Sequence, residues 1–231
     1  MDVNSAGTSI QDVLARLHAI DDELPPEDGV AVFNHMYCTV TEQVDASLSG
    51  GQFFHDPHFM THLDVTFASL WLEAFDAPAN AVPKAWAPLF ERREDRSLLP
   101  IQFAVAGMNS HIGHDLPVAV VRTCRDLGSS PQDSGVRADY EKVNELLAAS
   151  ESEVRRSFLS EAGQALDGDV GPAIHLISTW DIDKAREVAW VNAETLWALQ
   201  DLGALAARYE VALAHTVGMT SRCLLTSVRP S

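Results

Sequence analysis

Apolar residues recur at helical spacing along nearly the whole chain, and this period is the feature that most limits the fold. The first stripe comprises Ile10, Val13, Leu14, Leu17 and Ile20. Residues three and four apart share one face of an α-helix, whereas a half-buried strand alternates apolar and polar residues. No alternating run bounded by hairpin turns occurs. The sequence therefore predicts an all-α fold, with a single domain over residues 1–231 of about seven or eight helices.

Proline, glycine and capping residues predict where these helices begin and end. A first helix ends near Pro25, and a second ends near Gly50. Asp56 and Pro57 are typical of an N-cap followed by a proline in the first turn, and they open a third helix. Further helices are predicted over residues 86–93, 99–127 and 139–160, from residue 181 onward, and over residues 205–225.

The charge and the cysteines limit the class of partner and the compartment. Lys and Arg number 16 against 33 Asp and Glu, a formal net charge of −17, which disfavours binding to nucleic acids or anionic membranes. Cys38, Cys124 and Cys223 lie far apart with no CxxC pair, which indicates a reducing compartment. The chain shows no secretory signal and no apolar run long enough to span a bilayer. We therefore predict a cytoplasmic protein without nucleic-acid or membrane partners.

Polar residues interrupt the otherwise apolar segment 100–117, PIQFAVAGMNSHIGHDLP. On a helix, His111, His114 and Asp115 are neighbours on one face and converge on one point. Two imidazoles and a carboxylate suit a divalent metal that keeps coordination positions open for substrate, water or dioxygen. This segment therefore predicts a buried metal site.

Further ligands to that metal are expected from other helices. Asp64 lies beside apolar positions of the third helix, where a carboxylate is costly unless it is paired or metal-bound. Asp139 is another candidate ligand, although near the predicted start of its helix it also complements the helix dipole. Whether His55, His58 or His62 contributes a ligand stays open.

Pro117 predicts disturbed helical geometry next to these candidate ligands. Its ring clashes with the carbonyl group of Gly113 in a regular helix, and its missing N–H leaves that carbonyl without a partner. Such irregularities occur where cofactors bind and also at ordinary corners between helices.

A purely structural interpretation competes with the metal site. The same polar cluster forms a buried hydrogen-bond network that only defines the packing. Isolated histidines such as His18 and His35 are expected at the surface or in structural hydrogen bonds, and Cys38 is expected to act as a small core residue. Asn192 is expected to join two helices. The tryptophans are predicted core residues: Trp71, Trp86, Trp180, Trp190 and Trp197.

Several motifs together resemble an actinobacterial family of uncharacterised all-helical proteins. They are FNHMYCTVTE, FHDPHFMTHLDVTFA, VPKAWAPLFERRED, the segment 100–117, ADYEKVN and AREVAWVNAETLW, and they extend over most of the chain. The family forms resemble FNRxY, LDxxFA, AGMNxHINHDLP, DYxxVN and AWxNAxxLW. This chain has His35 where the family has arginine and Gly113 where it has asparagine. The matching positions are Asp64, Asn109, His111, His114, Asp115, Asp139, Tyr140, Asn144 and Asn192.

The family is similar, more distantly, to helical non-heme diiron monooxygenases that tailor terpenoid antibiotics. This resemblance implies an oxygenase in which Asp64, His111, His114 and Asp115 share two irons with a further acid, such as Asp139, or water. Asn109 and Tyr140 are implied catalytic residues, together with Asp64. The substrate is expected to be a hydrophobic small molecule held among aromatic side chains.

Two alternatives remain open at this stage. His114 and Asp115, with His62 or His111 before them and Asp139 after them, also resemble the H…HD…D order of HD phosphohydrolases, in which zinc or manganese would generate hydroxide. A non-enzymatic helical domain that binds a ligand or a partner is the second alternative. Serine hydrolase, P-loop, Rossmann and zincin motifs are absent from the sequence.

Overall fold

The computed structural model describes residues 8–50, 53–147 and 181–227, and the predicted all-α class is confirmed in this part of the chain. The division into a single domain stays a prediction. In these three ranges, no helix is long and apolar enough to cross a membrane. The elements are α1 (Ile10–Glu23), α2 (Gly29–Ser49), α3 (Pro57–Asp76), α4 (Ala87–Arg92), α5 (Pro100–Ser110), a π-helical turn η1 (His111–Asp115), α6 (Leu116–Leu127), α9 (Ile182–Leu199) and α10 (Gly203–Leu224).

Side chains at the predicted boundaries cap several of these helices. Ser9 and Asp12 form a reciprocal capping box at the start of α1. Asp56 accepts a hydrogen bond from the N–H of Phe59 at the start of α3, and Asp181 accepts one from Lys184 at the start of α9. These contacts confirm the helix starts expected at residues 56–57 and 181.

The predicted helix over residues 99–127 is continuous but irregular at its centre. Between α5 and α6, the turn η1 replaces the α-helical pattern, and the N–H of Leu116 bonds to the carbonyl group of His111, five residues earlier. Pro117 follows directly, so the irregularity lies where its missing donor and its ring disturb a regular helix. The disturbance predicted beside the histidines is therefore confirmed as a single π turn.

The helix expected to begin at residue 139 begins earlier, because residues 134–147 are helical. Asp139 therefore lies inside this helix, and the prediction that it lies near a helix start is wrong. Its two carboxylate oxygens accept hydrogen bonds from the backbone N–H groups of His55 and Asp56, at 2.8 and 2.7 Å. Asp139 thus supplies the hydrogen-bond acceptors for two backbone N–H groups just ahead of α3. Residues 148–160 of the predicted helix, and Trp180, lie outside the described residues.

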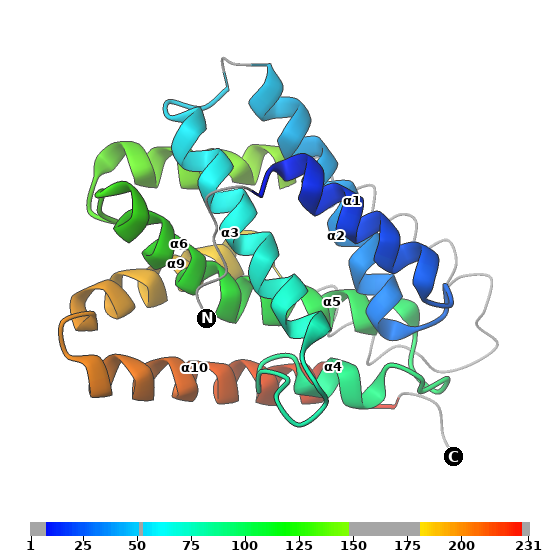
Figure 1. Ribbon diagram of the computed structural model, residues 1–231. Helices are drawn as coiled ribbons and strands as arrows, with labels where there is room; N and C mark the ends of the chain where they lie inside the picture. The colour runs from blue at the N-terminus through cyan, green and yellow to red at the C-terminus, as the bar shows by residue number, and fades with distance from the viewer. Residues whose placement is uncertain (1–7, 51–52, 148–180, 228–231) are drawn as a thin grey trace.

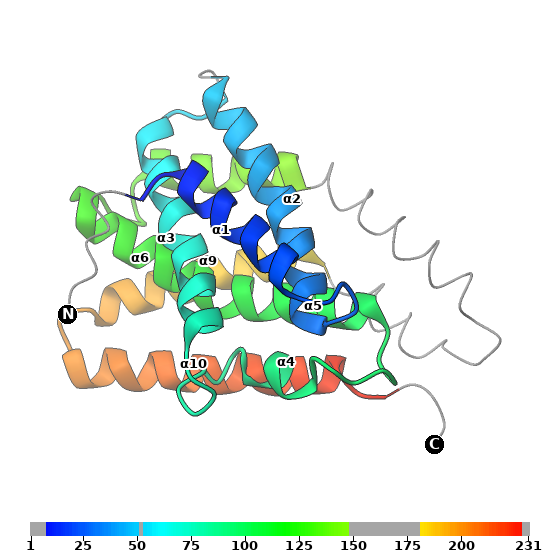
Figure 2. The same ribbon diagram turned by 45° about the vertical axis from the view of Figure 1, so that its right-hand side comes forward.

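The helices form two adjoining apolar clusters. One cluster lies among α1, α2, α3, α5 and α10, with Phe33, Trp71 and Trp86 at its centre, and the other lies among α3, α6 and α9, with Trp190 buried in it. In both views α10 runs along one side of the molecule, with α4 beside it (Figures 1 and 2). The turn η1 contacts α3, α9 and α10, so the polar residues it carries lie in the interior.

The FNHMY segment links the first three helices. Asn34 on α2 donates to the carbonyl oxygen of Leu17 and to the Asp21 carboxylate on α1, and it accepts a hydrogen bond from Trp71 on α3. Asn34 is fully buried, so each of these bonds satisfies a polar group inside the core. Phe33 in the same segment packs edge-on against His111 of η1, which connects this junction to the candidate site.

Candidate functional site

Asp115 is the centre of a buried polar cluster. Its Oδ2 lies 2.9 Å from His111 Nδ1, and its Oδ1 lies 2.7 Å from His114 Nδ1. Trp86 Nε1 also donates to Oδ2, at 2.9 Å. All four side chains are buried, and the π turn places His111 and Asp115 so that their side chains meet. Every bond that Asp115 makes here therefore orients a neighbouring ring.

The charge state of this cluster follows from burial and hydrogen bonding. Burial opposes ionisation of Asp115, but the hydrogen bonds from His111 and His114 outweigh it, so the pKa of this carboxyl lies below its ordinary value. Burial lowers the pKa of His111, although Asp115 acts in the opposite direction. At neutral pH a neutral His111 therefore donates from Nδ1 to an ionised Asp115, which leaves a lone pair on Nε2.

His111 borders an apolar cavity of about 90 Å³. Phe67 stacks on the imidazole with ring centroids 3.5 Å apart, and Tyr37 meets it edge-on at 4.5 Å. His111 Nε2 is buried and has no hydrogen-bond partner within the described residues. The other apolar residues that line the cavity come from α2, α3, α5, η1, α6, the helix over residues 134–147 and α9, and they include Met36, Val40, Val44, Met60, Leu63, Met108, Ile112, Leu116, Val143, Leu147 and Ile182.

Two more polar side chains on this cavity contain atoms that lack partners. Asp64 Oδ2 and Tyr37 Oη are both buried and form no hydrogen bond within the part of the chain that the structure describes. Burial, and secondarily Asp45, raises the pKa of Asp64 to about 7. Burial, and then the Asp64 charge, raises the pKa of Tyr37 well above its ordinary value. The cavity therefore has one acid that titrates near neutral pH, one neutral phenol and one imidazole base.

Arg186 of α9 also lines the cavity. Its Nε donates to Asn144 Oδ1 at 2.5 Å, and its Nη2 donates to the carbonyl group of Tyr140 at 2.6 Å. The guanidinium lies over the Tyr140 ring, 4.2 Å from its centroid, and Tyr140 Oη donates back to the Arg186 carbonyl group. Among the described residues, no carboxylate forms an ion pair with this buried cation. Tyr140 and Asn144 therefore position Arg186 at the cavity wall.

Three predicted site residues lie away from the cavity or act elsewhere. Asn109 donates to the carbonyl group of Val217 and to Ser221 Oγ, and so joins α5 to α10. Asp139 binds the backbone ahead of α3. His62 pairs with Asp126, with His62 Nε2 3.2 Å from Oδ2. Asn192 accepts a hydrogen bond from Tyr209 of α10, which confirms its expected role between helices.

The structure separates the predicted metal ligands into two sets. Asp64 and His111 line the cavity, whereas His114 and Asp115 face each other through Nδ1 and Oδ1 and do not line it. Asp64, His111, His114 and Asp115 do not form a group of three ligand atoms within 4.8 Å of one another. These donors therefore do not fit a dinuclear iron centre, which needs several ligands on each ion. The ligand assignments stay a prediction.

Sequence reasoning missed two residues of the cavity wall, Tyr37 and Arg186. Tyr37 falls on the apolar stripe of its helix, so its hydroxyl group gave no separate signal. Arg186 precedes Ala189, Trp190 and Ala193 at spacings of three, four and seven, and this helical register was the signal that placed it on the buried face of α9.

The fold is all-helical, and the buried pair formed by His111 and Asp115 includes one residue, His111, that lines an apolar cavity. The chain belongs to DUF5995, a family of unknown function, which residues 10–227 match. No curated protein and no solved structure matches the chain.

Replacement of Asp64 by asparagine is expected to change how stability depends on pH. The folded-state pKa is raised from 3.8 to about 7, so the native state binds an extra proton between these values and its stability falls as pH rises from about 4 to 7. At about 1.4 kcal/mol per pKa unit, the loss is at most about 4 kcal/mol in total, and at most about 3 kcal/mol of it falls between pH 5 and pH 8. Asparagine removes this loss. Urea unfolding at pH 5 and pH 8 measures it, and Asp201→Asn, at an exposed carboxylate, should leave the pH dependence unchanged.

Proposed function

We propose that the cavity binds a small, mainly apolar molecule that carries a hydroxyl or carbonyl group, and that His111 transfers a proton to or from that group. The observation that carries this proposal is the set of three buried polar atoms without partners on one apolar cavity: Tyr37 Oη, Asp64 Oδ2 and His111 Nε2. A buried polar atom without a hydrogen bond costs about 1–3 kcal/mol, and a ligand that pairs with these atoms recovers that cost.

The acid–base assignment follows from the environments of the two ionisable groups. Asp115 accepts the Nδ1 proton of His111 and orients the imidazole, so Nε2, which has no partner within the described residues, is the basic atom of this cavity-lining ring. The positive charge that develops on His111 during proton transfer is stabilised by the ionised Asp115. Asp64, with a pKa of about 7, supplies the matching acid at neutral pH.

Phenol is a suitable probe because it combines an apolar ring with one hydroxyl group. We expect phenol to bind the full chain saturably. The titration is monitored by the NMR chemical shifts of amide and side-chain groups, and the groups whose shifts change should lie around the cavity. His111→Gln keeps a donor for Asp115 but places a shorter side chain at Nε2, and it should weaken binding about tenfold. Asp64→Asn should change the affinity and its pH dependence.

His62→Gln is the matched control, because His62 pairs with Asp126 and does not line the cavity. This variant should bind phenol as the unchanged protein does. Shifts that map outside the cavity, or equal affinities for the wild type and His111→Gln, would overturn the proposal. Absence of saturable binding would overturn it as well.

The iron-dependent oxygenase stays a prediction with one supporting observation. His111 Nε2 and Asp64 Oδ2 are both available, and both residues line the same apolar cavity. One imidazole and one carboxylate are part of a mononuclear iron site, which requires a further protein ligand. Comparing the iron content of the wild type and His111→Gln, both purified without chelator, tests it. A cytoplasmic location and a lack of nucleic-acid and membrane partners also stay predictions.

A further inference from the structure

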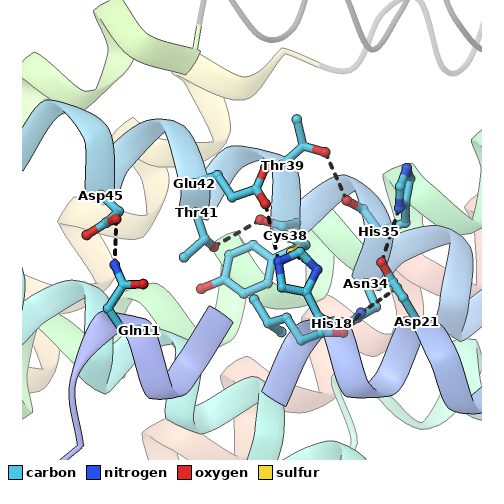
Figure 3. A network of polar contacts seen from close by, with 12 residues as sticks. Gln11, His18, Asp21, Asn34, His35, Cys38, Thr39, Thr41, Glu42 and Asp45 are labelled. Carbon is cyan, nitrogen blue, oxygen red and sulfur yellow. Dashed lines mark hydrogen bonds and ion pairs between the residues drawn. The ribbon is translucent and has the colours of Figure 1, made fainter. Parts of the chain in front are cut away.

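A second cluster of ligand-type side chains lies on the surface between α1 and α2, away from the cavity. His18 projects from α1 toward Cys38 and Glu42, which are one turn apart on α2 (Figure 3). His18 Nε2 lies 3.3 Å from Glu42 Oε1 and 3.9 Å from Cys38 Sγ. Within the described residues, these three form the one group of His, Cys, Asp or Glu whose ligand atoms all lie within 4.8 Å of one another.

These separations are close to the distances between ligand atoms in a tetrahedral zinc site. With Zn–N and Zn–O distances of about 2.0–2.1 Å and a Zn–S distance of about 2.3 Å, tetrahedral angles place nitrogen about 3.3 Å from oxygen and about 3.6 Å from sulfur. The nitrogen–oxygen separation already agrees, and the nitrogen–sulfur separation is a few tenths of an ångström longer. The Cys38 sulfur lies 3.7 Å from His18 Nδ1, so the exposed His18 ring must rotate to direct Nε2 at the ion.

We propose that His18 Nε2, Cys38 Sγ and Glu42 Oε1 bind one Zn²⁺ ion between α1 and α2. The side chains of His18 and Glu42 are 57% and 50% exposed, so the fourth coordination position faces solvent and takes water or an external ligand. The Cys38 thiol loses its proton to the buffer as the Zn–S bond forms.

The surroundings of the cluster favour a cation. Burial, and then the charges of Glu42 and Asp21, raise the pKa of the Cys38 thiol to about 11. The same two carboxylates attract a divalent ion, whose charge replaces that of the lost proton. The site thus concentrates negative charge around a soft sulfur ligand, a combination that zinc binds well.

Hydrogen bonds on both sides of the cluster hold the two helices in register. Gln11 on α1 donates to Asp45 on α2 at one end, and Asp21 pairs with Asn34 and His35 at the other (Figure 3). The three ligands therefore require little reorganisation to bind the ion. Because zinc binds the folded arrangement and bridges two helices, its binding raises the melting temperature of the protein.

The test is a zinc titration of the full chain after removal of metal by chelator, with a competing chromophoric chelator as the readout. We expect one zinc per chain, and a Co²⁺-substituted protein should show the near-ultraviolet band of a cobalt–thiolate bond. His18→Ala and Cys38→Ser should each lower the affinity about 100-fold and abolish the cobalt band or weaken it strongly. His18→Ala changes an exposed side chain, so this variant is expected to fold.

Matched controls are present in the same chain. Cys223→Ser removes an exposed thiol on α10, far along the chain from the three proposed ligands. The Cys223→Ser variant should bind zinc as the unchanged protein does, and so should His215→Ala, which removes an exposed histidine on the same helix. Equal affinity in His18→Ala and the wild type, or no cobalt–thiolate band, would overturn the proposal. Loss of zinc in His111→Gln but not in Cys38→Ser would place the ion in the cavity and overturn it too.

Discussion

Replacement of Asp115 by alanine is expected to lower the free energy of unfolding by about 3–5 kcal/mol. The carboxylate accepts hydrogen bonds from His111, His114 and Trp86, and all four side chains are buried. Alanine leaves three buried donors without an acceptor and opens a cavity beside the π turn. Urea unfolding followed by circular dichroism at neutral pH measures the loss.

Asp126→Ala is the control for this prediction. Asp126 lies on the same long helical segment and also pairs with a histidine, but its side chain is 51% exposed. Solvent replaces the lost contact there, so the expected change is less than about 1 kcal/mol. If Asp115→Ala lowered the free energy of unfolding by less than about 1 kcal/mol, the three buried donors would not depend on this carboxylate for their hydrogen bonds, and the prediction would be wrong.

Gly218→Ala is expected to destabilise the protein by about 3 kcal/mol. A Cβ atom at Gly218 on α10 would clash with the backbone carbonyl oxygen of Lys84, in the segment ahead of α4. A backbone atom cannot rotate away as a side chain can, so the helix and this segment must separate. Ser110, which donates to the neighbouring Ala85 carbonyl group, would then lose part of its contact with this segment. Thermal and urea unfolding measure the effect.

Gly203→Ala, at the start of the same helix, is the matched control. A Cβ atom there meets nothing within 4 Å. Alanine has a higher helix propensity than glycine, so this variant should be unchanged or more stable by up to about 1 kcal/mol. Similar unfolding free energies for the two variants would contradict the close approach of α10 to residue 84.

Predictions that depend on neighbours in the sequence were accurate. The helix starts at Asp56 and Asp181 follow from capping contacts between residues three apart, and the irregular turn before Pro117 follows from the geometry of proline itself. The helix containing Asp139 starts earlier than predicted, and the buried carboxylate accepts hydrogen bonds from the backbone ahead of α3 rather than from its own helix end.

The sequence by itself determined the all-α class, most helix ends and the pairing of His111 with Asp115, because these depend on the helical period and on contacts within one turn. Only the tertiary structure decided that Asp64 and Tyr37 line the same cavity as His111, while His114 faces away from it. It also brought His18 to Cys38, 20 residues apart. Spacing along one helix cannot predict which faces of different helices meet, because that depends on how the whole core packs.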